Sequence, residues 1–123
     1  MYFFSMKNEV FYRQIVLVFR DFRLVKAKRI LLKEILTGNV FPEKTLANAQ
    51  DGMLTSLANN LILVKETDKQ AISAIILGGM IYLTLLAHND RSMVGLDLRN
   101  EENWERIENA LEVILLALNG VDT

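Results

Sequence analysis

The sequence predicts an all-α protein, built as an antiparallel bundle of four to six helices. One Pro and six Gly interrupt the 123 residues. Long stretches between them place apolar residues three and four positions apart, which is the spacing of one helix face. These stretches are rich in Leu, Ala, Lys and Glu, which favour helices. We expect a single helical domain over 1–123, with helices near 8–37, 42–64, 68–88 and 101–119.

The region 8–37 combines an apolar stripe with a basic face. The stripe contains Ile15, Phe19, Phe22, Val25, Arg29 and Leu32, and the residues expected to face water include Arg13, Arg20, Arg23, Lys28 and Lys33. Gly38 stands where a glycine would end the helix. Asp21 could cap a second helix, so one helix or two stays open. We interpret the basic residues, Lys26 included, as a solvated face, because acids elsewhere neutralise them.

The second helix is expected to begin at Pro42, since proline suits the first helical turn. Its apolar residues, Leu46 to Val64, recur at helical spacing, although Gly52 weakens its continuity. A new helix should begin at Thr67 or Asp68, because Thr67 and Gln70 match the capping-box pattern.

The region 68–88 is apolar nearly all round, so a membrane span must be weighed against burial in a bundle. Between Lys69 and Asp90 there is no charged residue apart from the titratable His88. At about 1.5 Å per residue the apolar core is roughly 25 Å long, short of a hydrocarbon layer of about 30 Å. The flanks also lack the aromatic and basic anchors expected on both sides. We therefore expect contact with other helices and no membrane association.

Both closing helices offer surface for a partner. Ala71, Ala74 and Gly78 share one face with Gly79 beside it, and such small residues let helix backbones approach closely. The helix 101–119 has Asn100 as N-cap, with Glu101 and Glu102 favouring its positive end. The residues at core-type spacing are Trp104, Ile107, Leu111, Ile114 and Leu118. A second apolar face consists of Ala110, Val113 and Ala117. The polar residues of the remaining arc are Glu105, Arg106, Glu108, Asn109 and Glu112. Such a helix has one face for its own core and another for a partner.

Catalytic, metal-binding and nucleic-acid-binding patterns are not found. His88 is the only histidine and the carboxylates lack ligand spacing, so we expect no metal, no cofactor and no enzyme activity. We expect His88 to cap free carbonyls at a helix C-terminus. With 14 basic against 15 acidic residues, the segment has no net positive field for nucleic acid. The absence of Cys suits a reducing compartment, and no signal peptide is visible, so the cytoplasm is expected.

The last third of the chain carries a family resemblance. A glycine-containing apolar helix is followed by Gly95-Leu96-Asp97, then by Trp104-Glu105-Arg106, and by a helix that ends in leucines and Gly120. This pattern resembles the C-terminal half of tetracycline-repressor (TetR) family regulators, and residues 18–36 resemble the region after that family's first ligand-domain helices. The family's helix-turn-helix reader is not found, because residues 1–37 are too apolar and lack its short glycine turn.

The resemblance implies an effector-binding and dimerisation domain, in which the last two helices of each copy form a four-helix contact across a two-fold axis. The expected dimer interface is Ala71, Ala74, Gly78, Gly79, Ala110, Val113, Ala117 and Leu118. A small apolar effector is expected at Phe19, Phe22, Met53, Leu57, Met80 and Tyr82, although ordinary core is the better interpretation of these spacings. The alternatives are a stand-alone homodimeric helical interaction protein without a small-molecule site and, third, a small membrane-associated helical protein.

Overall fold

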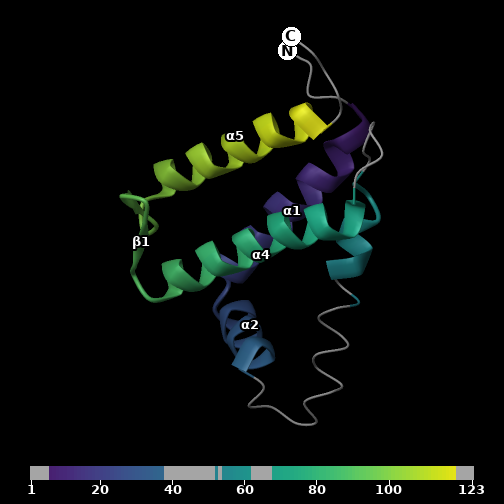
Figure 1. Cartoon of the computed structure of the whole chain (residues 1–123). Coiled ribbons are helices and arrows are strands. Elements are labelled where there is room, and N and C mark those ends of the chain that lie inside the picture. Colours follow the sequence, from purple (N-terminus) through teal and green to yellow (C-terminus); the bar gives the residue numbers. More distant parts are fainter. Residues whose placement is uncertain (1–5, 38–51, 53, 62–67, 119–123) are drawn as a thin grey trace.

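The computed structural model confirms the all-α class (Figure 1). It describes residues 6–37, 52, 54–61 and 68–118. Its elements are α1 (Met6–Leu24), α2 (Lys26–Thr37), α4 (Lys69–His88), β1 (Ser92–Met93), β2 (Leu96–Asp97) and α5 (Glu101–Leu118), with a further helical stretch at 54–58.

The first helical region is two helices, and the chain bends between them at Val25. The backbone N–H of Val25 still donates to the Asp21 carbonyl at 2.9 Å, and the N–H of Arg29 donates to the Val25 carbonyl at 2.9 Å. The break therefore falls after the Arg20–Phe22 stretch that the sequence suggested. Because the bend changes the direction of the apolar stripe, Val25 and Arg29 are exposed, contrary to their expected place on that stripe.

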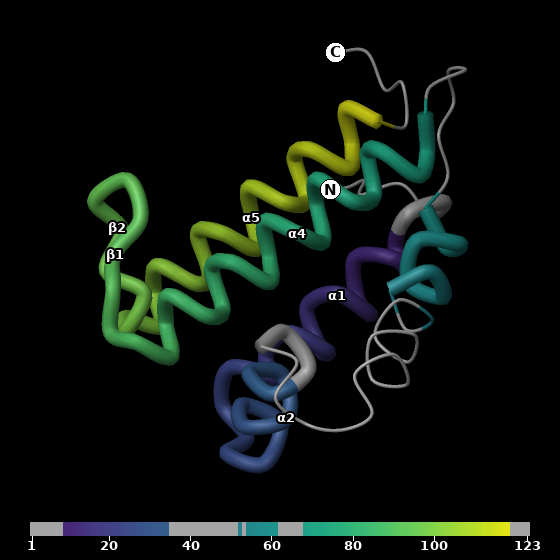
Figure 2. The backbone as a smooth tube through the Cα atoms, turned by 60° about the horizontal axis from the view of Figure 1, so that its bottom comes forward, coloured from purple at the N-terminus to yellow at the C-terminus, as the bar shows by residue number. Residues whose placement is uncertain are grey.

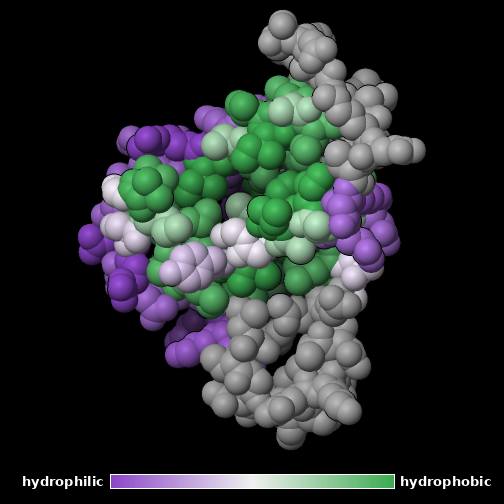
Figure 3. Space-filling model, viewed as in Figure 1, coloured by the Kyte–Doolittle hydropathy of each residue, from purple (hydrophilic) through white to green (hydrophobic). Residues whose placement is uncertain are grey.

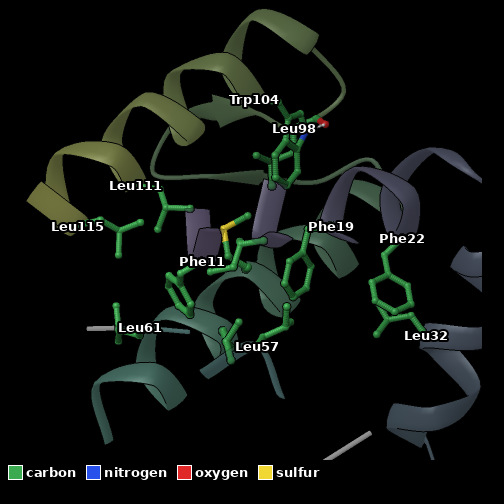
Figure 4. Close-up of a cluster of buried hydrophobic side chains, with 13 residues drawn as sticks. Phe11, Phe19, Phe22, Leu32, Leu57, Leu61, Leu98, Trp104, Leu111 and Leu115 are labelled. Carbon is green, nitrogen blue, oxygen red and sulfur yellow. Dashed lines mark hydrogen bonds between the residues drawn. The ribbon is translucent and has the colours of Figure 1, made fainter. Parts of the chain in front are cut away.

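Helix α1 is the centre of the fold. Helices α2, α4 and α5 each contact α1, whereas α4 and α5 approach each other less closely (Figure 1). Figure 2 shows the same helices from a second direction. Figure 4 shows the core that results, with side chains from every helix converging on α1. Its members are Phe11, Ile15, Phe19, Phe22, Leu32, Leu57, Leu61, Leu77, Met80, Leu98, Trp104, Leu111 and Leu115.

The helix expected over 42–64 ends earlier than predicted, because the described helical residues stop at Ala58 and a turn follows at 59–60. The N–H of Asn60 donates to the Leu57 carbonyl at 3.1 Å, and its side-chain amide donates to Oε1 of Gln14 at 2.6 Å. The same amide lies 3.5 Å from the Ser56 carbonyl, and asparagine competes with helical hydrogen bonding through such local bonds to the backbone. The expected start at Pro42 lies outside the described residues.

Local hydrogen bonds fix both ends of α4. The Asp68 carboxylate accepts from the Ala71 N–H at 3.1 Å, which confirms the expected helix start. At the other end Asp90 has φ 55°, the N–H of Arg91 donates to the Leu86 carbonyl at 2.9 Å, and the N–H of Asp90 donates to the Ala87 carbonyl at 3.1 Å. These two bonds form a Schellman motif, with an aspartate in the left-handed position.

A β-hairpin, which the sequence reading took as a plain link, joins α4 to α5. Strands β1 and β2 pair antiparallel, Ser92 with Asp97 and Met93 with Leu96. Val94 and Gly95 form the turn with φ 52° and 78°, the left-handed pair of a type I′ turn. The N-cap at Asn100 is confirmed, since its side-chain oxygen accepts from the Glu102 N–H at 2.9 Å. The hairpin returns the chain so that α5 runs antiparallel to α4 (Figures 1 and 2).

Candidate functional site

A wholly apolar groove lies between α4 and α5. Its volume is about 460 Å³. Figure 3 shows hydrophobic residues gathered over these two helices on the face seen in Figure 1. The groove is lined by Ile72, Ile75, Ile76, Gly79, Met80 and Leu83 of α4 and by Ile107, Ala110, Leu111, Ile114 and Leu118 of α5. Among the residues that the structure describes, none of those lining the groove has a polar side chain that could orient a reacting group, so the groove suits apolar contact.

The residues expected at a dimer interface lie on this face or next to it. Ala71, Ala74, Gly78, Gly79, Ala110, Val113 and Ala117 are exposed, and Leu118 is half-buried. Gly79, Ala110 and Leu118 line the groove itself. Ala74 and Gly78 line a separate depression of about 380 Å³ on the neighbouring side of α4, facing residues 54–59. The expected residues therefore divide between α4 and α5, and they do not all meet in the groove.

Large apolar side chains extend the face beyond those small residues. Ile75 is 75% exposed and Val113 is 65% exposed, and Tyr82 and Ile114 are exposed beside them. We call the groove together with these four side chains the α4–α5 face. Contiguous apolar surface of this kind marks interaction sites on soluble proteins.

Helix α4 is long and apolar enough to cross a membrane, by length and composition. Among the described residues it is the one helix that passes this test, and only 22% of its apolar window is buried in the fold. A core helix of a soluble protein would be mostly covered by its own chain. The residues that the structure describes therefore leave most of this apolar window uncovered.

The residues expected to bind an effector do not meet in one cavity. Phe19, Phe22 and Leu57 are buried in the core cluster, as Figure 4 shows. Met80 is buried at the floor of the groove, and Tyr82 is 53% exposed. Met53 lies outside the described residues. Of the expected residues, Met80 alone lines the groove.

Two arginines that were expected to face water attach α1 to α5. That expectation is wrong for Arg23, which is buried, whereas Arg20 keeps a side chain that is 47% exposed. The Arg23 side chain is 6% exposed, donates to both carboxylate oxygens of Glu101 at 2.7 and 3.0 Å, and lies 4.3 Å from the ring centre of Trp104. Arg20 makes a second two-bond pair, to Glu108, at 2.8 and 3.2 Å. Glu108, expected in the polar arc, is 8% exposed. These two ion pairs hold α5 against α1.

The charge of Arg23 changes the acidity of its partner. Hydrogen bonding to Arg23 lowers the pKa of Glu101 below its ordinary value, against a smaller opposing effect of burial. The paired form is therefore charged at neutral pH, as two-bond guanidinium–carboxylate pairing requires.

His88 caps a carbonyl, but that carbonyl belongs to α1 and not to its own helix. Its Nε2 lies 2.8 Å from the Phe22 carbonyl oxygen, so the ring donates from Nε2. Phe22 is within the last turn of α1, where carbonyls lack partners in their own helix. Burial lowers the pKa of His88, and the nearby charge of Arg29 lowers it further, while the bond to Phe22 opposes both effects.

Within the described ranges, no group of three or more His, Asp or Glu side chains is placed to hold a metal ion. A second exposed apolar stripe runs along the outer side of α1 at seven-residue spacing, formed by Val10, Leu17 and Leu24. Sequence reasoning missed this stripe, because it assigned the apolar residues of α1 to the core alone.

No protein-family model matches the chain, and the comparisons found no significant match among curated proteins or solved structures.

Proposed function

We propose that this chain is a homodimeric helical domain that serves as the effector-binding and dimerisation part of a TetR-like transcriptional regulator. The observation that carries the dimer is the α4–α5 face, a continuous apolar surface with a groove of about 460 Å³ between two antiparallel helices. Ile75 and Val113, which are 75% and 65% exposed, supply large apolar side chains that a second copy would cover. The regulator role rests on the resemblance of the closing helices to that family.

Burial of apolar area supports association through this face. Each Å² of apolar surface removed from water stabilises a contact by about 25 cal/mol. A stable interface covers roughly 800 Å² on each partner. Two helices of 20 and 18 residues, lying side by side, offer a surface of that order. A two-fold contact of α4 and α5 with their copies would form a four-helix arrangement.

Sedimentation velocity over a concentration series tests the dimer directly. Val113→Asp should raise the dimer dissociation constant at least about 100-fold, because an unpaired carboxylate in an apolar contact costs several kcal/mol. Leu17→Asp is the matched control, since Leu17 is 61% exposed and Val113 65% exposed, on different helices. The Leu17 variant should remain a dimer.

Other outcomes would overturn this assignment. A monodisperse monomer at all concentrations removes the dimer. Dissociation by Leu17→Asp with no effect of Val113→Asp moves the contact to the outer stripe of α1. Protein that stays in solution only with detergent would favour the membrane-associated alternative, in which lipid covers α4.

The regulator role needs its own experiment. The chain should be fused behind a helix-turn-helix domain that binds its operator only as a dimer, since half-site recognition couples two reader heads. We expect the fusion to repress a reporter and the Val113→Asp fusion to lose repression. Repression by both fusions, or by neither, would contradict a dimerisation role.

A further inference from the structure

A second cavity of about 570 Å³ lies between α2 and the C-terminal end of α4. Its α2 wall is Lys26, Arg29, Ile30 and Lys33, whose spacing places them on one helix face. Its α4 wall is Leu85, His88 and Asn89. We call this cavity the basic cleft. Leu85 lies about 160° around α4 from Leu83 of the apolar groove, so the two sites face different directions.

The cations of the basic cleft have no acidic partner among the residues that the structure describes. The ion pairs there join Arg13 to Glu9, Arg20 to Glu108, Arg23 to Glu101 and Arg99 to Asp97, and none of them includes Lys26, Arg29 or Lys33. Three cations around one cavity produce a positive potential that attracts an anion.

Helix capping does not account for these cations. Lysine and arginine often bind the free carbonyls at a helix C-terminus. At the end of α4 three of those carbonyls already have donors: the Leu85 carbonyl accepts from the Asn89 side chain at 2.9 Å, and the Leu86 and Ala87 carbonyls accept from backbone N–H groups. The Phe22 carbonyl across the cleft accepts from His88. The charges of α2 are therefore available for another anion.

The cleft also has apolar surface. Ile30 is 51% exposed, and Leu85 is half-buried on the opposite wall. A guanidinium such as that of Arg29 matches the two oxygens of a carboxylate or phosphate. The cavity volume is within the range of small-molecule sites, about 300–1,000 Å³.

We propose that the basic cleft binds a small organic anion, with a carboxylate or monophosphate at Arg29 and Lys33 and a short apolar body against Ile30 and Leu85. This site is independent of the dimer contact, since it lies on another side of α4. Lys26 adds charge at the edge of the site, and His88 forms part of its wall.

His88 offers a direct readout, because it is the only histidine in the chain. Its imidazole resonances can be followed by NMR while hexyl phosphate is added. The groups that act on His88 are the Phe22 carbonyl and the charge of Arg29. A bound anion would offset the charge of Arg29, so we expect saturable shifts and a rise in the pKa of His88.

Single substitutions identify the cleft as the binding site. Arg29→Gln and Lys33→Gln should each weaken hexyl phosphate binding about fivefold to tenfold, through loss of one charge-assisted contact. Lys28→Gln is the matched control, because Lys28 is an exposed cation of the same helix that does not line the cleft. It should change the affinity less than about twofold.

Three outcomes would overturn the site. Sodium chloride at equal ionic strength could produce the same shifts, which would mean screening rather than binding. Hexanol could bind as well as hexyl phosphate, which would mean a merely apolar cavity. Binding could also occur only to phosphatidylglycerol vesicles and weaken equally with Lys28→Gln, which would mean diffuse attraction to a lipid surface. Saturable binding of free hexyl phosphate that depends on Arg29 supports the cleft.

Discussion

Substitution of the two adjacent glycines in the middle of α4 should affect the stability of one chain and the stability of the dimer differently. A Cβ built on Gly78 or on Gly79 meets no atom within 4 Å. Alanine therefore fits at either position within one chain. Because alanine favours a helix over glycine by about 1 kcal/mol, Gly78→Ala and Gly79→Ala should each stabilise an isolated chain by about that amount.

The same substitutions should act in the opposite direction on the dimer. If the small residues allow the backbones of two copies to approach, an added methyl group at Gly79 separates them and costs contact on both copies. Overpacking a close contact typically costs about 1–3 kcal/mol. The dimer dissociation constant should then rise by roughly tenfold or more.

The assay uses two backgrounds. Urea unfolding in the Val113→Asp background, where we expect a monomer, measures the effect on one chain. Sedimentation equilibrium of the otherwise unaltered chain measures the effect on the dimer. A loss of monomer stability would refute the reasoning from open space around the glycines. A dimer that Gly79→Ala leaves unchanged or tightens would refute close approach at this position.

Three further predictions concern the fold. Arg23→Ala should cost about 2 kcal/mol of unfolding free energy, because the side chain loses its contacts with the Trp104 ring and with Glu101. The exposure of Glu101 weakens the ion-pair part of this loss. Arg13→Ala should cost under about 0.5 kcal/mol, and equal urea midpoints for the two variants would contradict this prediction. Val94→Asn should stabilise the folded chain by about 1 kcal/mol, which raises the melting temperature by roughly 4 °C. The reason is that Val94 is 91% exposed and has a left-handed backbone conformation, which asparagine tolerates better than valine. An unchanged or lower melting temperature would refute this argument about the turn. Since the pKa of His88 is lowered in the fold, the unfolded chain binds its proton first, so stability should fall as the pH drops below about 6.5. His88→Gln should remove that slope in urea titrations. A second decline in stability is expected below about pH 4.5, because protonation of Glu101 breaks its ion pair with Arg23 and the pKa of Glu101 is lowered in the fold. His88→Gln should leave this second decline unchanged. A slope that His88→Gln leaves unchanged would exclude this histidine as its source.

Features that depend on near neighbours in the chain were predictable. The class is all-α because apolar residues recur at helical spacing, and the caps at Asp68 and Asn100 follow from side chains that bond N–H groups two or three residues ahead. The exposed second face of α5, with Val113 on it, was also visible as periodicity.

The hairpin of β1 and β2 was missed although its residues are near neighbours in the chain, because its turn begins with Val94, and valine is unusual in the left-handed region.

Features that depend on distant residues were not predictable from periodicity. Arg23 looked like a solvated cation, because its partner Glu101 lies 78 positions away along the chain. The basic cleft was missed for the same reason, since the basic residues of α2 alone look like a solvated face and its other wall comes from α4.

The sequence by itself determined the helical class, both ends of α4, the start of α5, and an excess of apolar surface on those two helices. Each of these depends on contacts within about one helical turn, which residue type and spacing specify. The tertiary structure decided the bend at Val25, the attachment of α5 to α1 through Arg20 and Arg23, and the separation of α4 from α5 that leaves a groove. These depend on which helix faces which, and packing sets that choice once all the helices are together.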